Sequence, residues 1–147
     1  MGAEKEHLLA YNGLYKENDE VYRNVAKAMG LSDCAFWILY FLREGARELK
    51  QSELCSTIYA PKQTVNSALK KLEEDGCIEL TAGRDRRSKL VRLTKKGADL
   101  AAETVDRVLA AELRAMGAMT AEEQTLFLGL FRKYTNLLKK EMGKLEQ

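Results

Sequence analysis

The sequence predicts a mainly α-helical protein that carries one small β-hairpin. Only one proline, Pro61, occurs in 147 residues. Near both ends of the chain, apolar residues recur every three or four positions, the spacing that lines one face of a helix. Two short segments, around residues 78 and 91, alternate apolar and polar side chains instead, which is the period of a half-buried strand. A chain of this length most simply forms one domain with a substantial core.

The N-terminal third predicts two helices. The first covers residues 4–28 and ends near Gly30, and Ser32 is suited to cap the second. The second contains nine consecutive apolar residues, CAFWILYFL. Because a helix that is apolar on every side is buried on several sides, we expect it to form the centre of the core. The apolar stripe of the first helix consists of Leu8, Tyr11, Tyr15, Tyr22, Val25 and Met29.

Two short helices joined by a tight turn are predicted next. The first covers residues 51–58 and turns Leu54 and Ile58 inward. Pro61 suits the first position of the second helix, which ends at Gly76. Such a pair is a helix-turn-helix motif. The inward stripe of its second helix consists of Val65, Ala68, Leu69 and Leu72.

A hairpin and two further helices complete the predicted fold. The segments CIELTA and KLVRLT alternate like strands, and GRDRRS joins them. A helix-turn-helix followed by such a hairpin is a winged helix. Thr94 is suited to cap one long helix from about Lys95 to Met116, and TAEE, residues 120–123, is a capping box that starts the last helix.

Basic residues concentrate on the winged helix. Residues 61–97 hold ten basic and five acidic residues, although the whole chain has a formal net charge of only +2. This asymmetry indicates a footprint for a polyanion. A solvated charged loop explains the charge equally well, so the surrounding structure must decide.

Several classes of protein are not expected. The chain has no run of 18 apolar residues for a membrane span and no signal peptide at its start, so we expect a cytoplasmic protein. Its three cysteines form no disulfide or zinc pattern. The only histidine is His7, which excludes a histidine cluster. We therefore expect neither an enzyme, a metal nor a cofactor.

Residues 31–97 resemble the DNA-binding core of the MarR family of bacterial regulators. The resemblance is carried by ELKQSELCSTIYAPKQTVNSALKKLEEDGCIEL and DRRSKLVRLTKKG. In the latter, Asp85 and Arg87 match the Asp-x-Arg signature of the family's wing. The helix with DCAFWILYFL matches the family's core helix, and the terminal helices match its dimerisation arms. The resemblance implies one domain, 1–147, with a winged-helix core at 31–97 and dimerisation helices at 1–30 and 98–147.

The second helix of the helix-turn-helix is expected to read bases. Its first turns present uncharged hydrogen-bonding side chains, and glutamine or asparagine can bind adenine through two hydrogen bonds. A phosphate contact is expected one turn later. A solvated polar face is the alternative interpretation. The residues predicted to bind DNA are Lys62, Gln63, Thr64, Asn66, Ser67 and Lys70.

The hairpin tip is expected to enter the minor groove, where arginine meets an enhanced negative potential. Asp85 is expected to pair with Arg87 and restrict its guanidinium, and the family resemblance implies that Arg87 contacts DNA. A flexible charged turn is the alternative. The hairpin residues predicted to bind DNA are Arg84, Asp85, Arg86, Arg87 and Lys89.

The terminal helices carry apolar stripes whose simplest use is a two-fold homodimer. Packing within one chain is the alternative. A dimer would place two reading helices about 34–36 Å apart on double-stranded DNA with a pseudo-palindromic sequence.

Two modes of control are suggested by the resemblance. Many such regulators release DNA when a small aromatic molecule binds between the dimerisation arms and the DNA-binding heads, although aromatic rings can simply fill a core. Some relatives sense oxidants through a thiol, and Cys34 lies in a first helical turn, where the dipole can lower a thiol pKa. The alternative is that Cys34 is an unreactive cysteine that only packs in the core. The predicted ligand-binding residues are Tyr11, Tyr15, Phe36, Trp37 and Tyr40.

The sequence therefore predicts a dimeric, sequence-specific DNA-binding transcriptional regulator, a repressor that a small ligand releases. Two alternatives stay open. One is a winged helix that binds nucleic acid nonspecifically or mediates protein interaction. The other is a regulator that senses oxidants through Cys34. A thiol enzyme would need a neighbouring base, and the only histidine lies 27 residues from Cys34 on another helix.

Overall fold

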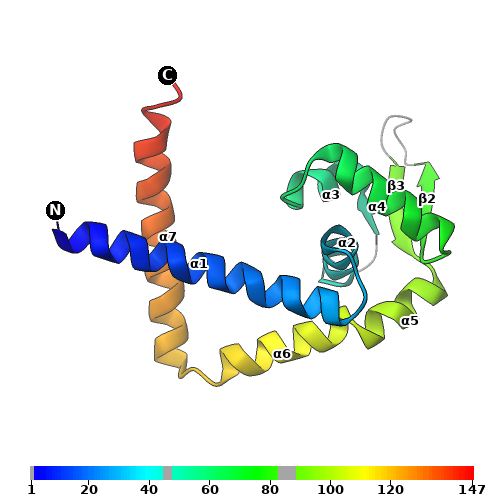
Figure 1. Ribbon diagram of the computed structural model, residues 1–147, viewed down its shortest axis with the longest axis horizontal. Helices are drawn as coiled ribbons and strands as arrows, with labels where there is room; N and C mark the ends of the chain where they lie inside the picture. Colours follow the sequence, from blue (N-terminus) through cyan, green and yellow to red (C-terminus); the bar gives the residue numbers. More distant parts are fainter. Residues whose placement is uncertain (1, 45–47, 83–88) are drawn as a thin grey trace. The chain divides into compact units, whose positions relative to one another are not determined.

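The computed structural model describes residues 2–44, 48–82 and 89–147 (Figure 1). This part of the chain is helical apart from one three-stranded antiparallel sheet, which confirms the predicted fold class. It forms two compact units, Met1–Arg107 and Val108–Gln147. The domain boundaries expected from the family resemblance stay predictions.

Helices α1 (Gly2–Ala28) and α2 (Asp33–Glu44) begin the first unit. Gly30 has φ +74°, a left-handed conformation that favours glycine and ends α1. The Ser32 hydroxyl accepts a hydrogen bond from the Ala35 amide at 3.2 Å, which confirms the predicted cap of α2. As expected, α2 is the centre of the core. Its fully buried side chains are Phe36, Ile38, Leu39 and Leu42.

Helices α3 (Gln51–Thr57) and α4 (Lys62–Glu74) form the helix-turn-helix. Pro61 is the N-cap residue that precedes α4, one position before the helical start predicted for it. At the other end Gly76, with φ +77°, terminates α4 as predicted. Helix α4 packs on α2. The buried residues of the motif, all predicted, are Leu54, Ile58, Val65, Leu69 and Leu72.

The sheet has the strand order β1-β3-β2. Strands β2 (Ile78–Ala82) and β3 (Lys89–Leu93) are the two predicted strands of the hairpin. The third strand, β1 (Glu48–Lys50), was not predicted; it pairs with β3 and places Leu49 opposite Val91. Because Val91 is fully buried, the sheet attaches the hairpin to the core through its central strand.

Helix α5 (Lys95–Glu103) begins directly against the backbone that enters β2. The Thr94 hydroxyl accepts from the Gly97 amide at 3.0 Å, confirming the predicted cap, and donates to the Gly76 carbonyl at 2.6 Å. The Thr94 amide also donates to the Cys77 carbonyl at 3.0 Å. A Cβ on Gly97 would lie 2.8 Å from the carbonyl carbon of Cys77 and closer still to its oxygen. Only glycine therefore fits at this position.

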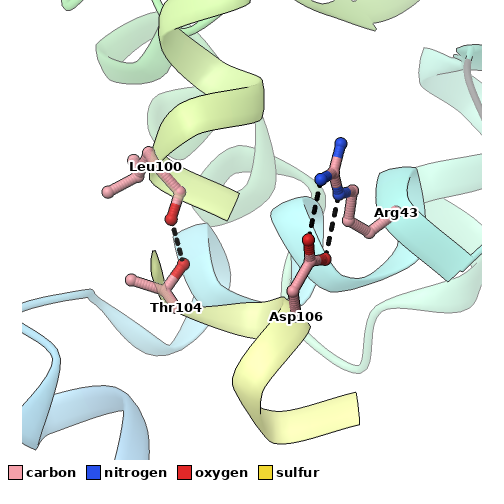
Figure 2. Close-up of polar contacts among 4 residues, drawn as sticks. All are labelled: Arg43, Leu100, Thr104 and Asp106. Atoms are coloured by element: carbon pink, nitrogen blue, oxygen red, sulfur yellow. Dashed lines mark hydrogen bonds and ion pairs between the residues drawn. The ribbon is translucent and has the colours of Figure 1, made fainter. Parts of the chain in front are cut away.

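The prediction of one long helix after the hairpin is wrong in one respect, because the helix breaks at Thr104. Helix α5 ends at Glu103, and α6 (Val105–Gly117) starts afresh beyond a buried residue with φ −120° and ψ −89°. Figure 2 shows that the Thr104 hydroxyl donates to the Leu100 carbonyl at 2.7 Å. It also shows Arg43 of α2 donating two hydrogen bonds to the Asp106 carboxylate, at 2.9 and 2.7 Å. These contacts attach the start of α6 to the core helix.

The second unit contains the rest of α6 and helix α7 (Ala121–Gly143). The predicted capping box is confirmed: the Thr120 hydroxyl accepts from the Glu123 amide at 3.1 Å, and the Glu123 carboxylate accepts from the Thr120 amide at 2.8 Å. None of the residues of α7 is buried. Its exposed large apolar side chains are Leu126, Phe127, Leu128, Leu130, Phe131, Leu137, Leu138 and Met142.

Over the described ranges, no single helix has the length and apolar content to cross a membrane. The pair α1 and α2, bent by 96°, meets that test by length and composition alone.

Candidate nucleic-acid interface and adjoining cavity

Helix α4 has one apolar face and one polar face. Val65 and Leu69 point into the core, whereas Lys62, Gln63, Ser67 and Lys70 are exposed. This polar face forms a shallow depression of about 470 Å³. Thr64 instead lines a neighbouring depression toward the start of α2. The predicted DNA-binding residues that share the polar face are Lys62, Gln63, Asn66, Ser67 and Lys70.

Asn66 differs from the other residues of this face because it is partly buried and held by α3. The Gln51 amide nitrogen donates to its side-chain oxygen at 2.9 Å, and the Cys55 thiol donates to the same atom at 3.8 Å. A bidentate contact with adenine needs both the oxygen and the nitrogen of an amide. Gln63 is exposed, so its amide is the one that can make that contact without losing another partner.

Sequence reasoning missed Gln51, which lies on α3 outside the predicted reading helix. Its spacing from Cys55 offered a signal, since residues four apart share a face of a helix. That spacing puts both side chains on the side of α3 that meets Asn66.

The hairpin is described only in its two strands. Lys89 is exposed at the start of β3. Arg92 and Glu79 are cross-strand partners and form an ion pair at 2.7 Å. That hydrogen bond raises the pKa of Arg92. The remaining predicted hairpin residues, Arg84, Asp85, Arg86 and Arg87, lie outside the described residues, so the pairing of Asp85 with Arg87 stays a prediction.

A cavity of about 550 Å³ adjoins the helix-turn-helix. It lies between α1, α2 and the turn that joins α3 to α4. Its aromatic wall centres on Trp37, whose ring lies 5.1 Å from that of Tyr22 and 5.7 Å from that of Phe41. The lining residues are Asp19, Tyr22, Arg23, Asp33, Cys34, Trp37, Phe41, Thr57, Ile58, Tyr59 and Ala60.

Of the five predicted ligand-binding residues, Trp37 lines this cavity. Phe36 is fully buried, and Tyr40 packs beside it on Trp37. Tyr11 and Tyr15 lie farther toward the N-terminus of α1, with their rings 6.2 Å apart. The structure therefore does not gather all five residues around this cavity, and their role in binding a ligand stays a prediction.

Cys34 is buried at the wall of the cavity. Burial raises the pKa of its thiol, and the negative charge of Asp33 adds to that effect. The direction is opposite to the lowering expected from the helix dipole. A higher pKa reduces the thiolate fraction that reacts with oxidants, which favours inert packing for Cys34. Within the described part of the chain, no cluster of three or more potential ligand residues could hold a metal.

These features define a winged helix-turn-helix DNA-binding protein. The model of the MarR family matches residues 29–88. The HTH-type transcriptional regulator YwoH of Bacillus subtilis (strain 168) is 31% identical over 105 residues, which are 71% of this chain and 76% of that protein. The chain belongs to the MarR family of transcriptional regulators.

Two solved structures show the same fold. The MarR family regulator NMB1585 from Neisseria meningitidis superposes with a TM-score of 0.78 over 94% of this chain and 97% of that one, at 22% identity. The organohalide-sensing regulator RdhR-CbdbA1625, bound to 2,4-dichlorophenol, has a TM-score of 0.60 over 89% of this chain and 79% of that one, also at 22% identity.

Proposed function

We propose that this regulator is a homodimer that binds a pseudo-palindromic operator through α4 and the β2–β3 hairpin, represses transcription there, and releases DNA when a small molecule occupies the cavity. The observation that carries the proposal is the division of α4 into a buried apolar face and an exposed polar face, with a basic hairpin nearby in sequence.

The exposed face of α4 supports sequence-specific binding. Gln63 offers both an acceptor and a donor to a base edge. Lys62 and Lys70 lie beside it and suit phosphate contacts, which fix the position of the helix without reading sequence. The ten basic residues of the 61–97 segment supply the electrostatic attraction to DNA.

The terminal helices support a homodimer. In α7 the side chains of Leu126 and Leu130 are 62% and 56% exposed, and Phe127 and Phe131 are half exposed. A contiguous apolar face of this kind marks an interaction site. A second copy of the chain covers it most simply, because a two-fold interface uses the same face on both partners.

The position of the cavity supports control by a ligand. Thr57 to Ala60, four of its lining residues, form the end of α3 and the turn that leads into α4. A ligand that contacts both this turn and α1 can favour one placement of α4 over another. It shifts DNA binding only as far as its affinity differs between the two placements. The dichlorophenol complex of RdhR-CbdbA1625 is a structural relative with a small aromatic ligand.

The test is to select the preferred operator from the source genome and to measure binding by fluorescence anisotropy. Gln63→Ala should cost about 1–3 kcal/mol on the operator and little on random DNA. Lys70→Ala should weaken binding to both alike. Lys139→Ala, a lysine on α7, is the charge-matched control and should change neither.

Salt dependence provides a second measurement in the same assay. A dimer with about 6–10 phosphate contacts should lose about 10³–10⁵ in affinity between 50 and 200 mM salt. An unchanged preference for the operator in Gln63→Ala would show that a different face reads the bases. Binding that does not respond to salt would contradict the electrostatic role of the basic hairpin.

A further inference from the structure

The cavity beside the helix-turn-helix is negatively charged at its rim. Asp19 from α1 and Asp33 from the first turn of α2 line it together with one basic residue, Arg23. The formal charge of these three side chains is −1. In the described part of the chain none of the three makes an ion pair or a side-chain hydrogen bond. Two carboxylates from separate helices are thus available to a ligand.

The body of the cavity is aromatic. Tyr22, Trp37 and Phe41 line it, and the Trp37 and Phe41 rings are stacked at an interplanar angle of 26°. The faces of such rings attract cations, and tryptophan does so most strongly. A volume of about 550 Å³ lies in the range of small-molecule sites. The walls therefore suit an aromatic molecule with a positive charge.

Cys34 lies at the same wall of the cavity, directly after Asp33 in the chain. The second cause of its raised thiol pKa, after burial, is the negative charge of Asp33. Asp33 and Cys34 both line the cavity, and Asp33 is exposed.

From these observations we infer that the effector of this protein is an aromatic organic cation, such as an aryl quaternary ammonium. Its ring packs against Trp37, and its charge lies toward Asp19 and Asp33. The inference rests on the proposed function, because it names the ligand class of the same cavity. An aromatic carboxylate would have Arg23 as its only basic partner in this lining and would meet two like charges.

The experiment compares three ligands that share one ring system and differ in charge: 4-phenylbenzyltrimethylammonium, 4-phenylbenzyl alcohol and 4-phenylbenzoate. Their binding to the full chain is measured by calorimetry at low salt, where exposed charges are least screened. Trp37 is the only tryptophan, so its emission reports binding at this wall. The cation should bind about tenfold tighter than the alcohol, and the carboxylate weakest.

Charge-neutralising variants test whether Asp19 and Asp33 cause the preference for the cation. Asp19→Asn and Asp33→Asn should each weaken cation binding about two- to fivefold, because both carboxylates are exposed, and should leave the alcohol unchanged. Arg23→Gln should strengthen cation binding. Glu20→Gln, on α1 but outside the lining, is the matched control and should have no effect.

Three results would overturn the inference: tightest binding by 4-phenylbenzoate, binding by none of the three, or the same affinity for the cation in both asparagine variants as in the parent. Operator binding is measured separately by anisotropy. Tight cation binding without release of DNA would support the ligand class and contradict the proposed control of DNA binding. A chain that binds the cation but no operator would contradict the proposed function alone.

Discussion

Replacing Gly97 by alanine should destabilise the protein far more than the same replacement elsewhere in a helix. The added Cβ would lie 2.8 Å from the carbonyl carbon of Cys77 and 3.1 Å from a methyl carbon of Leu93. The clash with Cys77 involves its backbone carbonyl group, just before β2, so rotating a side chain cannot relieve it. The start of α5 and the entrance to β2 must move apart instead.

The size of the effect follows from these contacts. Carbon atoms pack best at about 3.5–4.0 Å, so relieving the contact with the carbonyl carbon alone requires a separation of roughly 1 Å, and the closer carbonyl oxygen requires more. Overpacking of this kind costs about 1–3 kcal/mol. The movement also stretches the hydrogen bonds from Thr94 to the carbonyls of Gly76 and Cys77, each worth about 1 kcal/mol. The better helix propensity of alanine offsets about 1 kcal/mol. The expected net loss is about 2–4 kcal/mol.

Urea unfolding followed by circular dichroism measures this loss. All variants are compared at one protein concentration, because association would add to apparent stability. Gly97→Ala should lower the midpoint by about 1–2 M urea. Gly13→Ala in α1 is the matched control, since its added Cβ meets no described atom within 4 Å beyond its chain neighbours and the local backbone of its own helix; it should raise stability by up to about 1 kcal/mol. Equal midpoints for the two variants would refute the steric argument.

Two further predictions concern pH and assembly. Hydrogen bonds from Arg43 lower the pKa of Asp106 in the folded protein. The stability that this ion pair contributes is therefore fully present above the pKa of Asp106 in the unfolded chain, about 3.9, and is lost as the pH falls through its lower pKa in the folded protein. Asp106→Asn should therefore cost about 0.5–1 kcal/mol at pH 7, with a difference from the parent that shrinks on acidification; a pH-independent difference in unfolding experiments would contradict this. Deletion of the chain after Thr120 removes α7 and should give a monomeric or aggregating product without tight operator binding. A well-behaved dimer in light scattering would oppose that assignment.

Local signals predicted most of the fold because they act within a few residues. Ser32, Thr94 and Thr120 each cap the helix that the sequence assigned to them. Gly30 and Gly76 end helices in the left-handed conformation that few other residues adopt. The α4 stripe and the two hairpin strands followed from apolar periodicity.

The differences arise from contacts between distant residues. Strand β1 is three residues long and turns only Leu49 inward, so it shows no period to detect. No glycine or proline stands beside Thr104 in the sequence to indicate that the helix breaks there. Its neighbour Asp106 binds Arg43, which lies 63 residues away in the chain. No window of local sequence contains both partners.

The candidate site divides in the same way. The polar face of α4 could be read from one helix, because its members follow a single period. The cavity combines α1, α2 and the turn before α4, and its wall includes Tyr22 and Phe41 rather than Tyr11 and Tyr15. Which rings meet depends on how α1 crosses α2, and apolar spacing within one helix does not specify that crossing.

Because Gln51 of α3 donates a hydrogen bond to Asn66 of α4, two helices together fix the side chain at one position of the polar face of α4. A substitution at Asn66 alone would leave the Gln51 amide without its acceptor. A substitution at Gln51 alone would free the Asn66 side chain to turn toward DNA. Homologues that diverge in operator sequence should therefore exchange these two residues as a pair. A library designed to retarget the protein to a new operator should accordingly randomise Gln51 together with the exposed residues of α4.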